Sequence, residues 1–90
     1  MFKVVYHYLV VQKDIPKLPA AWKEKIKRAI ESRLTTKPDV YGKPLRRSFK
    51  NYRKLRVGDY RVIFRIEGNL VKILIIQHRS IVYSSAEKRI

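Results

Sequence analysis

The sequence predicts a small α+β domain in which helices pack on an antiparallel sheet. Two turn dipeptides, Gly58-Asp59 and Gly68-Asn69, separate three apolar-rich segments between Tyr52 and Arg79. Such dipeptides between alternating apolar residues indicate tight β-hairpins. Upstream, residues 19–34 carry apolar side chains at helical spacing. A chain of 90 residues supports one small core, so we expect a single domain over residues 1–90.

Two-residue turns would fix how the predicted strands pair. They place Val57 opposite Tyr60 and Glu67 opposite Leu70, and side chains then alternate between the two faces. One predicted face is apolar and would form the core: Leu55, Val57, Tyr60, Val62, Phe64, Ile66, Val71, Ile73 and Ile75.

The other predicted face is strongly basic. It contains Tyr52, Lys54, Arg56, Arg61, Arg65 and Lys72, with Ile63, Leu74, Ile76 and His78 among them. Arg56 would lie opposite Arg61, and like charges directly opposite each other destabilise a sheet. We therefore expect this face to stay uncovered and to hold a polyanion.

The remaining elements are expected on both sides of the hairpins in the sequence. Residues 2–8 are rich in aromatic and β-branched side chains and indicate an amino-terminal strand. The long helix, from about Pro19 to Leu34, should cover the apolar face, with Trp22 as an anchor. Before it, Asp14 is expected to cap a short helical turn that has Pro16 in its first turn.

Three further segments complete the expected fold. Residues 35–43 contain Pro38, Asp39 and Gly42 and indicate a loop. Residues 44–49 are expected to add a strand, and residues 80–90 suit a short carboxy-terminal helix.

The charge of the chain narrows the kinds of partner. Lys and Arg number 22 against 7 Asp and Glu, which gives a formal net charge of +15. A nucleic acid, a ribonucleoprotein or an acidic protein is the expected partner. The hydrophobic content of 46% excludes a disordered basic tail.

Composition also excludes several kinds of chemistry. The chain has no cysteine, which excludes disulfides, thiolate zinc sites and cysteine nucleophiles. The two histidines, His7 and His78, lie on separate segments, so we expect neither a metal nor a cofactor. No segment approaches the roughly 20 apolar residues of a membrane helix, so a cytoplasmic location without membrane contact is expected.

The basic face has the residue types that RNA cleavage without a metal requires. The ribose 2′-hydroxyl attacks phosphorus, while the protein accepts its proton, stabilises phosphoryl charge and protonates the departing 5′-oxygen. Arginine suits the phosphoryl contact, and lysine, tyrosine or histidine could transfer protons. From spacing alone, a non-catalytic binding surface is the alternative.

Four motifs identify a family that the chain resembles. They are KDIPKLP at residues 13–19, GKPLR at 42–46, LRVGDYRVIFRI at 55–66 and HRSIVY at 78–83. In order and spacing they resemble the RelE branch of the RelE/ParE toxin superfamily of type II toxin–antitoxin systems. The resemblance implies a compact α+β fold, ribosome-dependent cleavage of messenger RNA in the A site, and neutralisation by a cognate acidic antitoxin.

The resemblance also implies site residues. Lys54 and Arg61 match residues that bind or activate the scissile phosphate, and Tyr83 matches an aromatic that stacks near the cleaved nucleotide or aids proton transfer. His78 and Arg79 match the members that end in His-Arg. Candidate RNA-binding residues are Tyr52, Arg53, Arg56, Arg65 and Lys72.

Two departures from the best-studied RelE pattern leave the general base open. That pattern has a second lysine where this chain has Tyr52, and an arginine where it has Gln77. Arg53 and His78 are the candidates to compensate. The alternatives from other classes are a ParE-like inhibitor of DNA gyrase, which acts by protein binding, and an RNA-binding module without catalysis.

Overall fold

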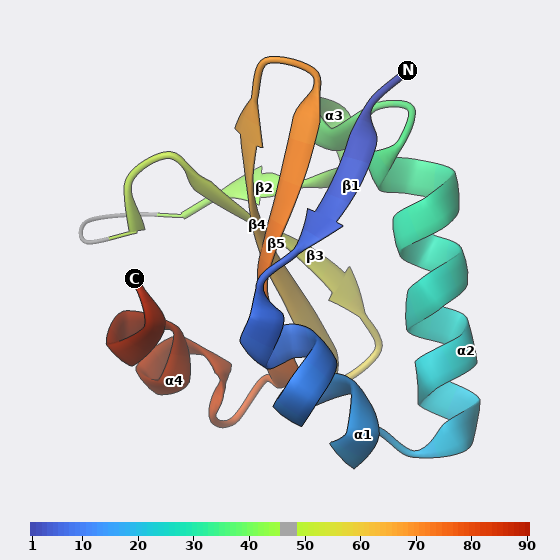
Figure 1. The fold of residues 1–90 in the computed structure, drawn as a ribbon, viewed down its shortest axis with the longest axis vertical. Coiled ribbons are helices and arrows are strands. Elements are labelled where there is room, and N and C mark those ends of the chain that lie inside the picture. Colours follow the sequence, from blue (N-terminus) through green and yellow to red (C-terminus); the bar gives the residue numbers. More distant parts are fainter. Residues whose placement is uncertain (46–48) are drawn as a thin grey trace.

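The computed structural model describes residues 1–45 and 49–90, and it has one five-stranded sheet with helices on both sides (Figure 1). The strands are β1 (Lys3–Tyr6), β2 (Lys43–Pro44), β3 (Tyr52–Val57), β4 (Tyr60–Glu67) and β5 (Leu70–His78). The helical segments are η1 (Val10–Asp14), α1 (Ile15–Lys17), α2 (Ala20–Ala29), η2 (Ile30–Leu34), α3 (Pro38–Tyr41) and α4 (Val82–Arg89), where η marks a π-helical turn. The predicted α+β class is confirmed.

The strand order is β1-β5-β4-β3-β2. All neighbouring strands are antiparallel except β1, which runs parallel to β5 with Lys3 opposite Leu70 and Tyr6 opposite Ile73. The expected antiparallel sheet is therefore confirmed for β2 to β5, and β1 adds a parallel strand at its edge. A parallel neighbour needs a long crossover, and the segment from η1 to β4 provides it.

Both predicted hairpins are confirmed, and the residues next to each turn pair as predicted. Val57 pairs with Tyr60, and Glu67 pairs with Leu70. Gly58 and Gly68 each have a φ of 59°, in the left-handed region that glycine adopts without steric cost.

A β-bulge in β5 changes which residues reach which face. Ile63 lies opposite Ile75 but Phe64 lies opposite Ile73, so Leu74 is an extra residue. Beyond it the alternation is reversed. The assignment of Ile75 to the face under the long helix is wrong, and so are those of Ile76 and His78 to the basic face. His78 pairs with Tyr60, so it lies at the end of the sheet on the α2 side.

The main core lies between the sheet and α2, as predicted. The long helix buries Ile26, Ala29, Ile30 and Leu34 against β-strand side chains. Trp22 is partly buried and its ring lies 5.4 Å from that of Tyr60, which supports its role as an anchor.

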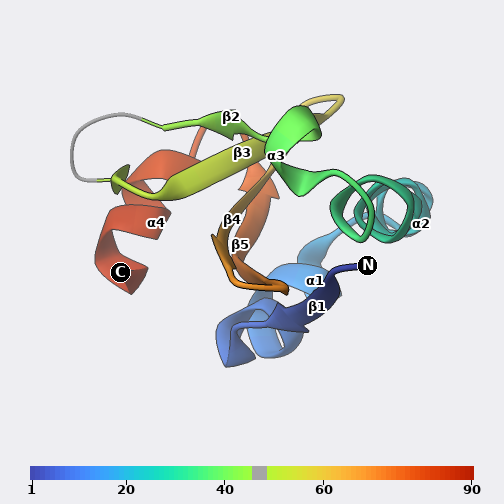
Figure 2. The ribbon, with the colours of Figure 1, turned by 90° about the horizontal axis from the view of Figure 1, so that it is seen from above.

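A second core covers part of the opposite face, which the sequence predicted to be open. Its buried residues are Phe49, Ile63, Leu74, Ile75, Val82 and Ala86. Figure 2 shows α2 and α4 on opposite sides of the sheet. The expected carboxy-terminal helix is thus confirmed, but its Val82 and Ala86, one turn apart, pack on the sheet and leave only part of the basic face accessible.

Several local predictions need correction. The amino-terminal strand is shorter than residues 2–8, and Asp14 makes no side-chain cap, because its carboxylate is buried in an ion pair with Arg89. The loop predicted for residues 35–43 contains α3. Of the strand predicted for residues 44–49, only Pro44 belongs to a strand, β2, and Phe49 lies in a 3-10 turn. Residues 46–48 of that prediction, which include Arg46 of the GKPLR motif, lie outside the described residues. No helix in the described parts of the chain is long and apolar enough to span a membrane.

Candidate functional site: a basic hollow beside the carboxy-terminal helix

A hollow of about 550 Å³ lies at the end of the sheet near the β3–β4 turn. Its lining residues are Lys54, Arg56, Arg61, His78, Arg79, Ser80 and Tyr83. We call it the basic hollow. It brings together every residue proposed above as catalytic, from β3, β4, the end of β5 and the first turn of α4.

Arg61 is the most buried member of the basic hollow. Only 7% of the residue is exposed, and its Nη1 donates hydrogen bonds to the carbonyl oxygens of Gly58 at 2.8 Å and Tyr60 at 2.9 Å. The expectation of an exposed sheet arginine is therefore wrong. Its guanidinium is held in place by the β3–β4 turn and is largely removed from water, which strengthens its interaction with an anion.

Lys54 and Tyr83 meet across the basic hollow. The Lys54 Nζ lies 5.9 Å from the centre of the Tyr83 ring, within the range of a cation–π contact. The Tyr83 ring also packs edge-on against Phe49, with centroids 6.3 Å apart. Tyr83 therefore packs on the second core and lines the hollow as well.

The surroundings of His78 determine where its proton lies. The backbone N–H of Ser80, which can only donate, points to His78 Nδ1 at 3.1 Å, and Ser80 Oγ lies 2.8 Å from the same nitrogen. Nδ1 is thus an acceptor, and the neutral ring carries its proton on Nε2. The ring also packs edge-on against Tyr60, with centroids 5.6 Å apart.

The two remaining arginines of the hollow differ in their partners. Arg79 Nε lies 3.7 Å from Asp59 Oδ1, and its backbone N–H donates to the Asp59 carbonyl oxygen at 2.8 Å. Arg56 is exposed and lies opposite Arg61, as predicted. Among the described residues Arg56 forms no ion pair with an acidic side chain.

The other proposed RNA-binding residues lie away from the basic hollow. Arg53 faces the opposite way and donates to the carbonyl oxygens of Asp39 at 3.2 Å and Gly42 at 2.9 Å, so it holds α3 in place. Its compensating role is not supported.

Tyr52, Arg65 and Lys72 cluster near the β4–β5 turn, at the other end of β4. The Arg65 guanidinium lies 5.7 Å from the Tyr52 ring centre, and Arg65 and Lys72 both form ion pairs with Glu67. A hydrogen bond from Lys72, together with the charge of Arg65, lowers the pKa of Glu67 below its usual value.

Sequence reasoning missed Ser80. Its signal was its place two residues after His78 in the HRS segment, a spacing at which a backbone N–H can return to the histidine ring. The described residues contain no group of three His, Cys, Asp or Glu side chains that could hold a metal ion.

Comparisons with known proteins place the chain in a family. Residues 2–83 match the family described as the ParE toxin of the type II toxin–antitoxin system parDE. A chain of the toxin–antitoxin complex RelBE2 from Mycobacterium tuberculosis is similar over 87% of this chain and 98% of its own, with 30% identity and a TM-score of 0.80. No curated protein sequence matches the chain.

Two more distant structures share the fold. A chain of the RelB–RelE complex from Methanococcus jannaschii has 24% identity, a TM-score of 0.68 and coverage of 90% of this chain and 96% of its own. The Escherichia coli toxin RelE, solved as a mutant in the free state, has 19% identity, a TM-score of 0.65 and coverage of 99% and 97%. With the family match over most of its length, the chain belongs to the RelE/ParE superfamily of type II toxin–antitoxin toxins.

Proposed function

We propose that the protein is a ribosome-dependent endoribonuclease of the RelE branch, which cleaves messenger RNA in the A site without a metal ion. The observation that carries this proposal is the convergence of Lys54, Arg61, His78, Arg79 and Tyr83 on one basic hollow. A hollow with this many cations fits a phosphodiester, and it also holds side chains able to exchange protons.

In the proposed reaction the 2′-oxygen forms a bond to phosphorus and the bond from phosphorus to the 5′-oxygen breaks. The products are a 2′,3′-cyclic phosphate and a 5′-hydroxyl. Arg61 contacts a non-bridging phosphoryl oxygen, because its guanidinium is already fixed by the carbonyl oxygens of Gly58 and Tyr60 and needs no reorganisation. Arg79 supports the same charge from the rim of the hollow.

Proton transfer is assigned by geometry. Since Ser80 occupies the acceptor site of His78, a neutral His78 can donate a hydrogen bond from Nε2 but cannot accept a proton there. Its role is to donate to a phosphoryl oxygen. Lys54 and Tyr83, which contact each other, are the pair that exchanges protons with the 2′- and 5′-oxygens, and the Tyr83 ring offers a stacking surface for a base.

The proposed protein partner is an acidic antitoxin. The M. tuberculosis and M. jannaschii relatives come from toxin–antitoxin complexes, and a net charge of +15 favours an acidic binding segment. Expression of the toxin alone should arrest growth, and coexpression of the antitoxin should restore it.

A ParE-like inhibitor of DNA gyrase is the second candidate, because the matching family is described as the ParE toxin. It would act by binding protein and would need no convergence of cationic and proton-transfer groups. The basic hollow favours the nuclease.

The decisive experiment compares three reactions of the purified protein. We expect cleavage of messenger RNA on programmed ribosomes, detected by toeprinting, with naked RNA left mostly intact and gyrase supercoiling unaffected. Absence of cleavage together with inhibited supercoiling would establish the ParE-like function instead. Binding of RNA without either effect would indicate a non-catalytic module.

A further inference from the structure

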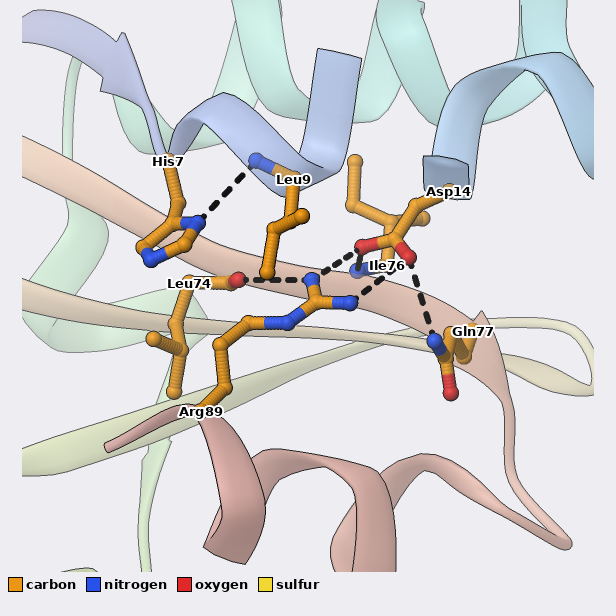
Figure 3. Close-up of polar contacts among 7 residues, drawn as sticks. All are labelled: His7, Leu9, Asp14, Leu74, Ile76, Gln77 and Arg89. Carbon is orange, nitrogen blue, oxygen red and sulfur yellow. Dashed lines mark hydrogen bonds and ion pairs between the residues drawn. The ribbon is translucent and has the colours of Figure 1, made fainter. Parts of the chain in front are cut away.

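Among the described residues the most buried charged side chain, that of Asp14, lies outside the basic hollow. The Asp14 and Arg89 side chains are only 1% and 8% exposed, and they form an ion pair with Arg89 Nη1 2.7 Å from Asp14 Oδ2 and Nη2 3.2 Å from Oδ1 (Figure 3). Asp14 ends η1, and Arg89 ends α4. The pair therefore joins segments near the two ends of the chain.

The ion pair closes the free edge of β5. β1 pairs with β5 only as far as Ile73. Just beyond, the Ile76 N–H donates to Asp14 Oδ2 at 3.0 Å, and Arg89 Nη1 donates to the Leu74 carbonyl oxygen at 3.1 Å. The carboxylate and the guanidinium thus satisfy backbone groups at the β-bulge that no strand reaches, so the last turn of α4 is bound to the bulge.

This attachment bears directly on the basic hollow. Val82 and Ala86 hold the first part of α4 on the sheet by apolar contacts, and Arg89 fixes its end. Tyr83 lies on that helix and faces Lys54. Asp14 is also connected to a strand neighbour of Arg61. Gln77 Nε2 donates to Asp14 Oδ1 at 3.1 Å, and Gln77 lies opposite Arg61 in β4.

Stability alone does not account for such a pair. Removing two charges from water costs several kcal/mol per ion, and well-packed apolar residues of similar volume often stabilise a protein as well or better. The ion pair also fixes the position and orientation of α4, because a guanidinium and a carboxylate meet in a defined geometry. Apolar packing alone would let α4 slide or rotate on the sheet.

We propose that Asp14 and Arg89 are a positioning pair that sets the place of α4, and through it the place of Tyr83 in the basic hollow. Neither residue lines the hollow, so neither contacts RNA in this assignment. The activity arm of the test rests on the proposed nuclease function. A second arm measures the position of Tyr83 without any substrate.

The activity arm is a double-mutant cycle on single-turnover cleavage. Arg89→Met should slow cleavage by at least tenfold with little change in ribosome affinity, and Arg89→Lys should restore part of the rate. In a Tyr83→Ala background, Arg89→Met should slow cleavage no further, because the residue through which it acts is gone. Ile30→Val, in the other core, is the control that lowers stability without moving α4. Equal losses from Arg89→Met in both backgrounds would overturn the proposal.

The second arm uses ¹⁹F NMR of protein labelled with 3-fluorotyrosine, in which loss of a signal in Tyr83→Phe assigns the Tyr83 resonance. Arg89→Lys and Asp14→Asn should shift or broaden that resonance, and Ile30→Val should not. Both variants keep a hydrogen-bonding group at the substituted position. They can therefore test the proposal even if Arg89→Met does not fold. An unchanged Tyr83 signal in both variants overturns the positioning role. A shifted signal in a protein that cleaves nothing supports the positioning role and rejects only the nuclease function.

Discussion

The ammonium group of Lys54 lies over the ring of Tyr83 in the basic hollow, with the lysine Nζ 5.9 Å from the centre of the tyrosine ring. Lys54 belongs to β3 and Tyr83 to α4, so the contact exists only because α4 folds back over the sheet. The sequence resemblance assigned both residues to the site, and the fold places both of them on the lining of the basic hollow.

Lys54→Ala should abolish most cleavage while the protein stays folded. A lost transition-state contact of about 2 to 4 kcal/mol corresponds to a rate loss of roughly 30- to 1,000-fold. The matched control is Lys25→Ala, because Lys25 Nζ makes the same kind of contact, 4.7 Å from the Trp22 ring centre, but lies on α2. Each substitution should cost about 1 kcal/mol of stability or less. Single-turnover cleavage and thermal unfolding measure both effects, and a comparable rate loss in Lys25→Ala would contradict the assignment.

Arg61→Ala should lose both activity and some stability. The residue is buried and donates to two carbonyl oxygens of the β3–β4 turn, so its removal should cost roughly 1 to 3 kcal/mol of unfolding free energy. Arg61→Lys keeps the charge but loses the planar fork, and should retain more stability than activity. Denaturant unfolding and cleavage of both variants test this. If Arg61→Lys cleaves like the parent, the proposed contact of the Arg61 guanidinium with a phosphoryl oxygen is wrong.

His78→Gln should keep most of the cleavage rate and the shape of its pH profile. Glutamine can place an amide N–H near the position of His78 Nε2, which is the donor that the Ser80 contact leaves available. His78→Ala has no such donor and should be slower. Single-turnover rates from about pH 5 to 9 distinguish the roles. A proton-transferring histidine would show a limb between about pH 5 and 8 in the parent that disappears in His78→Gln.

The two hairpin glycines should differ in their tolerance of alanine. Both have a φ of 59°, so each Gly→Ala substitution costs roughly 1 to 2 kcal/mol of backbone strain. A Cβ at Gly68 meets nothing within 4 Å, but one at Gly58 would lie 2.2 Å from Trp22 Cη2. Gly58→Ala should therefore cost about 1 to 3 kcal/mol more than Gly68→Ala. Equal unfolding free energies would mean that Trp22 moves aside freely.

Glu67 should make stability depend on pH at the acid end. The Lys72 hydrogen bond and the charge of Arg65 lower the pKa of Glu67 in the folded protein. Its contribution is therefore present above the unfolded value of about 4.3 and is lost as the pH falls through the folded value. The melting temperature of the parent should exceed that of Glu67→Gln at pH 6 to 7 by a small margin that closes below about pH 4. The opposite trend would contradict the lowered pKa.

The sequence predicted the elements better than their contacts. Turn glycines at Gly58 and Gly68 and a stripe of apolar residues on α2 have local signatures, so both hairpins and the long helix could be placed in advance. The bulge at Leu74 has none, because Ile73, Leu74, Ile75 and Ile76 are all apolar and either phase of alternation fits.

The same reasoning applies to the site. The sequence sufficed to name every residue of the basic hollow except Ser80, but not their surroundings. Nothing local signals that Arg61 is buried by carbonyl oxygens, that Arg53 holds α3, or that Asp14 reaches Arg89 at the far end of the chain. The Arg53 and Asp14 contacts join separate elements and depend on how these elements pack, whereas the Arg61 contacts depend on the backbone conformation of the β3–β4 turn.

The parallel pairing of β1 with β5 has a consequence for synthesis of the protein. Lys3 to Tyr6 have no strand partner until Leu70 to Ile73 have been made, and Asp14 waits for Arg89. Such high sequence separation between partners makes the closing step late and slow compared with formation of α2. Tyr83 enters the hollow in the same step. The basic hollow is therefore completed only after the last strand and α4 have been made.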